Sequence, residues 1–367
     1  MWSDLFWPYV GGTEVLGAVL MVALRKRGHE FLVLTSQDSL ELPGTDRYDG
    51  IPIQRLPLRA VMSGRELGRL REIRHEVAAI KATFAPDLVH ANGVGPSLLI
   101  HLQTADAWAA PWVLTLQQEL LPSQLSPGES LLHRALSSAA WVAACSEAVL
   151  TQARELAPEI ASRSSVIRNT VDAPGPSPTR TREWNRLFCI GRLVPAKGFD
   201  VALTAVASLR ARFPGLRLII AGDGPMRREL ETMAAELGLG HAVDFRGWVA
   251  PEEVPTLLDG GGIVLMPSRR EGLPLVAVQA ALMACPIVAS RVGGLPEVVV
   301  HEETGLLVER EDPRGLADAI AFLLDHPHVA EHLGRAARVR TRDVFAWERC
   351  VDAYDRLYTS VAGGHTC

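Results

Sequence analysis

The sequence predicts an α/β protein that consists of two doubly wound parallel sheets covered by helices. Short β-rich runs alternate with amphipathic segments, a proline-rich run interrupts this alternation once, and the alternation then starts again. The chain has 367 residues, of which 48% are hydrophobic and 22% are charged. It is therefore long enough for two domains and too apolar to be disordered.

The first domain is expected over residues 1–172. A doubly wound sheet normally opens with a strand, yet "MWSDLFWPYVGG" reaches a loop almost at once. We therefore expect that the first strand is missing, or that the natural chain begins upstream of Met1. The later runs that favour strands are "EFLVLTS" (30–36), "IPIQRL" (51–56), "PDLVHA" (86–91), "PWVLTL" (111–116), "WVAAC" (141–145) and "SVIRN" (165–169).

Proline and glycine mark a linker at residues 173–185, "APGPSPTRTREWN", because this run offers little for a core to bury. The second domain is expected over 186–344, and its strand candidates are "RLFCI" (186–190), "RLIIAG" (217–222), "VDFRG" (243–247), "GIVLMP" (262–267), "PIVAS" (286–290) and "GLLVE" (305–309). Both sheets can direct the carboxyl ends of their strands into an interdomain cleft, where we expect the ligand. Residues 345–367 open with a helical pattern, and we expect this helix to pack back on the first domain.

Composition limits the possible partners. A net charge of −5 and a pI near 6.1 give no overall attraction to nucleic acid, so any anion site must be local. The five cysteines form no C-x-x-C pair and no His/Cys cluster, which predicts reduced thiols, a cytoplasmic protein and no metal site. The apolar run "VLGAVLMVAL" (15–24) is too short to span a bilayer and has no signal-peptide cleavage site.

Two cations stand close together in "GRLVPAKG" (191–198), directly after an expected strand. Arg192 and Lys197 could neutralise a diphosphate leaving group there without a metal ion. The alternative is that both are ordinary solvated loop charges. The chain contains no P-loop pattern, and "GDGPMR" (222–227) does not fit the dinucleotide fingerprint.

A second candidate site lies in "PSRREGLPLVAVQAALMACPIVAS" (267–290). Glu271 follows a strand and precedes a helix expected to start near Pro274, so it could accept hydrogen bonds from two sugar hydroxyls. The N–H groups of that helix could hold phosphate oxygens. Alternatively, Glu271 only complements the helix dipole. Gln279 lies eight positions later, on a similar face of the helix.

Three weaker candidates lie in the first domain. Gly11 and Gly12 open a helix and could let the backbone approach an anion, although a tight turn needs the same residues. His90 ends an expected strand and is either structural or functional. The segment 55–81 could meet a phosphorylated acceptor or an anionic membrane surface, or could be simply solvated. It carries Arg55, Arg59, Arg65, Arg69, Arg71, Arg74 and Lys81 against Glu66, Glu72 and Glu76.

Taken in order, these pieces resemble the retaining GT-B glycosyltransferases of family 4, also called group 1 glycosyl transferases. GT-B enzymes consist of two Rossmann-like domains that face a cleft. The resemblance covers nearly the whole chain and is strongest over residues 186–310. The matching pieces are "PYVGGTE", "RGHE", "PDLVHANG", "SVIRNTVD", "GRLVPAKGFD", "LIIAGDGP", "FRGWV", "PSRREGLPL", "VASRVGGLPEVV" and "ETGLLVE".

The resemblance implies that the second domain binds a nucleoside-diphosphate sugar, with Arg192 and Lys197 on the diphosphate and Glu271 on the sugar. Gly272 and Leu273, which follow that glutamate, would also contact the donor. The backbone at Val249 would meet the base. In the first domain Gly12, together with Gly11, would approach the phosphates and the reacting carbon.

The chain departs from the family pattern at two positions. Gln279 stands where relatives usually have a second glutamate that binds the ribose, and an amide can still bond a ribose hydroxyl. Gln117, in "VLTLQQE", stands where many relatives have a histidine that contacts the sugar. The function of Gln117 and that of His90 are therefore left open at this point.

The implied reaction is transfer of a sugar to an acceptor hydroxyl with retention at the anomeric carbon, without a cofactor or metal. The departing phosphate would take the acceptor proton on the same face, and the protein would supply positioning and charge. The acceptor could be a glycan, a lipid or a small molecule, and a lipid would place the protein at the inner face of the membrane. Two alternative interpretations remain. The protein could be a non-catalytic homologue that binds nucleotide-sugar, or a nucleotide-sugar 2-epimerase, although the carboxylates and histidines of such an epimerase are not recognisable in this sequence.

Overall fold

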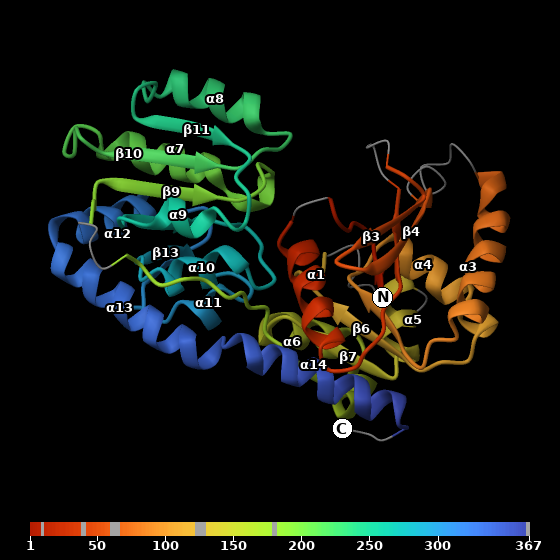
Figure 1. The fold of residues 1–367 in the computed structure, drawn as a ribbon. Coiled ribbons are helices and arrows are strands. Elements are labelled where there is room, and N and C mark those ends of the chain that lie inside the picture. The colour runs from red at the N-terminus through yellow and green to blue at the C-terminus, as the bar shows by residue number, and fades with distance from the viewer. Residues whose placement is uncertain (9–10, 38–41, 59–66, 122–129, 178–181, 365–367) are drawn as a thin grey trace. The chain divides into compact units, whose positions relative to one another are not determined.

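The computed structural model describes residues 1–367 except 9–10, 38–41, 59–66, 122–129, 178–181 and 365–367. The chain divides into two compact units (Figure 1). The first unit contains residues 1–168 and 348–367, and the second contains residues 169–347. Each unit is an α/β domain built on a largely parallel sheet. Among the described residues, no helix combines the length and the apolar character needed to cross a membrane.

The first unit contains an eight-stranded sheet in the order β3-β4-β2-β1-β5-β6-β7-β8. Neighbouring strands run parallel except β3 and β4, which are antiparallel. The strands are β1 (Trp2–Ser3), β2 (Val33–Ser36), β3 (Thr45–Tyr48), β4 (Ile51–Leu56), β5 (Val89–Asn92), β6 (Trp112–Leu116), β7 (Trp141–Ala144) and β8 (Ser164–Val166).

The first strand is present, and its predicted absence is wrong. In β1, Trp2 pairs with Leu34 of β2 and with Ala91 of β5, so the strand lies inside the sheet. Trp2 is 1% exposed. A strand of two residues shows no alternation of apolar and polar side chains, and for this reason the sequence pattern could not reveal it.

The helices of the first unit alternate with its strands. They are α1 (Gly12–Arg25), α3 (Leu70–Phe84), α4 (Pro96–Gln103), α5 (Leu131–Ser138), α6 (Glu147–Leu156) and α14 (Trp347–Ala362). The last helix, from Glu348 onward, groups with the first unit. Its Asp352 forms an ion pair with Arg27, with 2.6 Å between Oδ1 and Nη1. Arg27 lies just beyond α1. The C-terminal helix therefore packs on the sequence-distant N-terminal part of the chain.

The second unit has a six-stranded parallel sheet in the order β11-β10-β9-β12-β13-β14. Its strands are β9 (Arg186–Ile190), β10 (Arg217–Ala221), β11 (Val243–Gly247), β12 (Ile263–Met266), β13 (Ile287–Ser290) and β14 (Leu306–Val308). Its helices are α7 (Phe199–Leu209), α8 (Arg227–Glu236), α9 (Val254–Leu258), α10 (Leu275–Leu282), α11 (Leu295–Val298), α12 (Pro313–Asp325) and α13 (Pro327–Val344).

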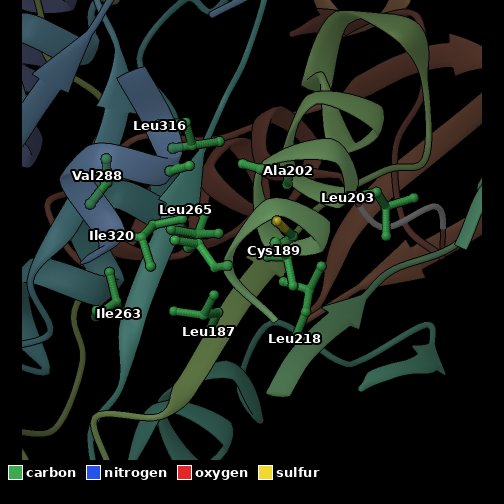
Figure 2. Packing of buried hydrophobic residues seen from close by; sticks show 14 of the residues in the cluster. Leu187, Cys189, Ala202, Leu203, Leu218, Ile263, Leu265, Val288, Leu316 and Ile320 are labelled. Carbon is green, nitrogen blue, oxygen red and sulfur yellow. The ribbon is translucent and has the colours of Figure 1, made fainter. Parts of the chain in front are cut away.

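A buried apolar cluster joins the sheet of the second unit to helices α7 and α12 (Figure 2). Leu187, Leu218 and Leu265 come from three neighbouring strands, while Leu203 and Leu316 come from the helices, and each is at most 1% exposed. The central strands read as continuous apolar runs because helices cover both faces of the sheet, with α10 contacting α9, α11 and α13. This packing fixes the strand ends, from which the site loops depart.

Candidate active site

The second unit has a topological switch point between β9 and β12. These strands are neighbours, but the chain continues from β9 toward β10 and β11 on one side, and from β12 toward β13 and β14 on the other. In open α/β sheets, ligands bind at the carboxyl edge where the strand order reverses in this way. The loops after β9 and β12 carry Arg192, Lys197 and Glu271, so the fold gathers the predicted diphosphate and sugar residues at one place.

Lys197 and Glu271 form an ion pair. The lysine Nζ lies 2.6 Å from Glu271 Oε1, and the Ser268 hydroxyl donates to the same oxygen at 2.8 Å. Glu271 is 8% exposed, whereas the side chain of Lys197 keeps 24% of its surface exposed. A buried carboxylate is stable only with such partners. The pair therefore presents a fixed cation and a fixed carboxylate at the switch point.

Gly198 allows the two loops to approach each other. It has a φ of 63°, and a Cβ at this position would lie 2.0 Å from the Pro267 carbonyl oxygen. Only glycine fits both the left-handed backbone and the close contact. Because Lys197 directly precedes Gly198 and Pro267 directly follows β12, this contact brings the lysine to the loop that carries Glu271.

Arg192 is exposed, and no hydrogen bond or ion pair joins its side chain to another residue in the described part of the chain. Gly272 and Leu273 are buried between Glu271 and α10. The Gly272 carbonyl accepts a hydrogen bond from the Gly294 N–H at 2.8 Å. The structure thus buries the residues after Glu271 and leaves the arginine open to solvent.

Arg269 joins the two site loops, a role that the sequence analysis did not foresee. Its guanidinium forms two hydrogen bonds with the Asp200 carboxylate, at 3.0 and 2.6 Å, and one with Glu311 at 2.9 Å. It also donates to the Pro195 carbonyl at 2.7 Å. Burial raises the pKa of Asp200, but the hydrogen bond and charge of Arg269 outweigh burial and lower it overall. In the sequence, the only indication of this link is that Arg269 lies close to Glu271 and Asp200 lies close to Lys197.

Gln279 links helix α10 to the segment after β11. Its Nε2 donates to the Pro251 carbonyl at 3.1 Å, and the residue is 5% exposed. Val249, two positions before Pro251, is half-buried, and the adjacent Trp248 is 58% exposed. The amide of Gln279 therefore holds the segment that contains the predicted base contact. An ionised glutamate at this position would have no proton to donate to the Pro251 carbonyl.

In the first unit, the switch point lies between β1 and β5, since β2 follows on one side and β6 on the other. Asn92 ends β5, and Gln117 follows the next strand, β6. Gln117 Nε2 donates to Asn92 Oδ1 at 2.8 Å. Gly11 caps the N-terminus of α1 and Gly12 is its first residue, so both predicted glycines open a helix.

His90 lies within β5 and not at its end, which corrects its expected position. Nδ1 pairs with the Tyr358 hydroxyl at 2.5 Å and Nε2 with the Thr115 hydroxyl at 2.7 Å. The residue is 4% exposed, and burial is the main cause that lowers its pKa to about 3. His90 is therefore a neutral core residue whose two nitrogens already have partners.

The basic segment 55–81 is not one exposed surface. Arg55 is 3% exposed and pairs with Asp46 at 3.1 Å, and Lys81 is 4% exposed and donates to the Thr104 carbonyl at 2.7 Å. Burial lowers the pKa of Lys81 to about 8. Arg59, Arg65 and Glu66 lie outside the described residues. The exposed charges that remain are Arg69, Arg71 and Arg74, together with Glu72 and Glu76.

The four described cysteines, at positions 145, 189, 285 and 350, are buried and take part in no disulfide among the described residues. Cys367 lies outside the described residues. Over the same described part of the chain, no group of three or more His, Cys, Asp or Glu side chains is arranged to hold a metal ion.

Comparisons with known proteins agree with this architecture. Sucrose-phosphate synthase from Thermosynechococcus elongatus superimposes with a TM-score of 0.81 at 23% identity, over 97% of this chain and 94% of that one. The Anabaena protein HepE, in complex with UDP and glucose, gives a TM-score of 0.78 at 21% identity, over 98% of both chains. Fold and strand order thus define the GT-B architecture of two Rossmann-like domains.

The family follows from sequence. The model of the "glycosyl transferase 4-like domain" matches residues 11–171, and that of the "glycosyl transferases group 1" matches residues 178–340. A glycogen synthase of Mycobacterium tuberculosis is 31% identical over 298 residues, which are 77% of this chain and 70% of that protein. The chain belongs to the group 1 glycosyl transferases.

Proposed function

We propose that this protein transfers a sugar from a nucleoside-diphosphate sugar to an acceptor hydroxyl, with retention of the anomeric configuration. The observation that carries the proposal is the Lys197–Glu271 pair, 2.6 Å between Nζ and Oε1, at the switch point of the second sheet. It offers a cation for phosphate and a carboxylate for sugar hydroxyls side by side. The complex of HepE with UDP and glucose, on the same fold, supports this class of donor.

Arg192 and Lys197 would bind the diphosphate. Negative charge on the leaving diphosphate grows as the sugar–oxygen bond breaks, so fixed cations stabilise the transition state more than the ground state. The lysine ammonium has three donors and can contact Glu271 and a phosphate oxygen together. With two cations in this role, we propose that the reaction needs neither a metal ion nor a cofactor.

Glu271 would accept hydrogen bonds from the hydroxyls of the transferred sugar, beside the backbone of Gly272 and Leu273. At the other end of the donor, the backbone of Val249 would contact the base. Gln279 would bind a ribose hydroxyl through Oε1, because its Nε2 donates to Pro251. Each part of the donor would thus meet a described element of the second unit.

In the first unit, Gly11 and Gly12 at the start of α1 would approach the phosphates and the reacting carbon. Gln117, which Asn92 orients, would contact the sugar as a neutral amide. Retention would arise because the departing phosphate accepts the proton of the acceptor hydroxyl on the face that it leaves. The protein then supplies orientation and charge and no covalent nucleophile.

The proposal is tested in two steps. First, UDP-, GDP- and ADP-sugars are compared for their effect on the unfolding temperature, because a ligand that binds only the native state raises it. Second, the stabilising sugar is incubated with glycan, lipid and small-molecule acceptors, and the anomeric configuration of the product is determined by NMR. Transfer with retention supports the proposal. Inversion contradicts it. If the protein binds the nucleotide-sugar but neither transfers nor slowly hydrolyses it, the protein is a nucleotide-sugar binder.

A further inference from the structure

We infer that Arg269 is a positioning residue that couples the loop carrying Lys197 to the loop carrying Glu271, and so sets the affinity for the diphosphate. The inference rests on the proposed function, since it assigns Lys197 to the diphosphate. It concerns a residue that would not itself touch the donor. Its basis is the set of contacts that Arg269 makes with three other segments of the second unit.

The contacts of Arg269 lie on both sides of the site. It belongs to the loop after β12, two positions before Glu271. Its Nη1 donates to the Pro195 carbonyl at 2.7 Å, and its backbone N–H donates to the Ala196 carbonyl at 2.8 Å. Pro195 and Ala196 form a single 3-10 turn with Lys197. One arginine therefore holds the turn that ends in the lysine.

The same guanidinium also holds helix α7, which begins one residue after that turn. Asp200, in the first turn of α7, receives two hydrogen bonds from Arg269, at 3.0 and 2.6 Å. Glu311, beyond β14, receives one from Nε at 2.9 Å. Because a guanidinium is planar, these acceptors fix its orientation as well as its position. The turn is thus fixed from two directions by one rigid group.

The side chains of Arg269 and Asp200 keep only 26% and 28% of their surface exposed. Such a half-buried, bidentate pair is screened less by solvent than an exposed ion pair. Without the Arg269–Asp200 pair, the turn that ends in Lys197 would remain attached to the loop after β12 through backbone contacts and the Lys197–Glu271 pair. We expect the ammonium then to sample a wider range of positions, which weakens binding of a ligand that needs one of them.

The experiment compares Arg269→Ala and Arg269→Lys with Arg212→Ala as the matched control. Arg212 pairs with Asp325 at 2.5 Å in the same unit, but it lies just beyond the opposite end of α7. The first measurement needs no ligand: amide hydrogen exchange over residues 191–198 and 267–274. Arg269→Ala should accelerate exchange in both segments, whereas Arg212→Ala should accelerate it in neither. Unchanged exchange in the Arg269 variants would overturn the coupling.

The second measurement is a double-mutant cycle with Lys197→Ala, using UDP, GDP or ADP as the probe, whichever stabilises the native protein. Arg269→Ala should weaken binding about tenfold in the native background, equal to about 1.4 kcal/mol, and less than about twofold when Lys197 is absent. Arg269→Lys should fall between the native protein and Arg269→Ala, because a lysine can satisfy one acceptor but not the fork.

The outcomes separate this inference from the proposed function. An equal loss of affinity in both backgrounds would show general damage to the domain and overturn the positioning role. If none of the three nucleotides binds the native protein, the proposed donor class fails, and with it the effect on affinity. The exchange measurement would still decide whether Arg269 couples the loops.

Discussion

Lys197 and Glu271 are 74 positions apart in the sequence, and the lysine Nζ lies 2.6 Å from the glutamate Oε1. The two residues reach each other because β9 and β12 are neighbours and their loops leave the sheet at the same edge. The Ser268 hydroxyl donates a hydrogen bond to the same carboxylate oxygen that pairs with the lysine. This arrangement is the centre of the proposed donor site and the basis of the first prediction.

Removing either cation should slow transfer strongly. We expect Lys197→Ala and Arg192→Ala each to lower kcat/KM by about 10²-fold or more, because these charges act most strongly on the transition state. Arg212→Ala, an exposed arginine of the same unit, should change it less than about twofold. Addition of EDTA should leave the rate of the native protein unchanged. Near-normal turnover of the double variant, or a strict need for Mg²⁺, would contradict the assignment.

Gln279→Glu should weaken the segment after β11. A carboxylate cannot donate to the Pro251 carbonyl, and it would stand in a position that is 5% exposed. We expect the free energy of unfolding to fall by about 1–3 kcal/mol and binding of the nucleoside diphosphate to weaken. Urea unfolding and calorimetric titration measure the two effects. Tighter nucleotide binding by Gln279→Glu would show that the ribose contact outweighs the link to Pro251.

Gln117 should act as a neutral sugar contact. We expect activity to fall in Gln117→Ala and to stay within about tenfold in Gln117→His, since one hydrogen bond to an uncharged group contributes about 0.5–1.5 kcal/mol. Initial rates with the stabilising nucleotide-sugar measure this. The opposite pattern is informative. If the native protein is inactive and Gln117→His is active, the native protein has lost transferase activity and only binds nucleotide-sugar.

His90 should make the first unit less stable in acid. Its pKa is lowered to about 3 in the folded chain, chiefly by burial, so between about pH 6.5 and pH 3 the unfolded chain binds more protons. Stability should therefore rise with pH across this window, and this histidine contributes up to about 1.4 kcal/mol per pH unit. His101, whose pKa burial also lowers to about 3, adds to the same slope.

The measurement is the free energy of unfolding in urea from pH 7 to pH 4.5. His90→Gln should reduce the slope against pH, even if it lowers stability at every pH by breaking the contacts with Tyr358 and Thr115. His75→Gln, an exposed histidine on α3, is the control and should leave the slope unchanged. An identical slope in His90→Gln and the native protein would show that His90 titrates normally.

Much of the fold was readable from the sequence, because the signals that define it are local. Buried parallel strands such as "RLFCI" and "RLIIAG" are continuous apolar runs, and they appear as β9 and β10 within a residue of the expected bounds. The class of protein also followed from short motifs in order, and both family models match it. The strand β1 was missed because two residues carry no periodic signal.

Only the tertiary structure decided which of the candidate side chains meet. Lys197 reaches Glu271, Arg269 reaches Asp200, and Gln279 reaches Pro251, in each case across a change of strand or loop that spacing along the chain does not encode. Burial was equally hidden in the sequence. Arg55 and Lys81 were predicted to lie on a charged surface and His90 was left open as structural or functional, yet each is buried. A local pattern specifies the element on which a side chain lies, whereas its neighbours, and therefore its charge and its function, come from segments far away in the chain.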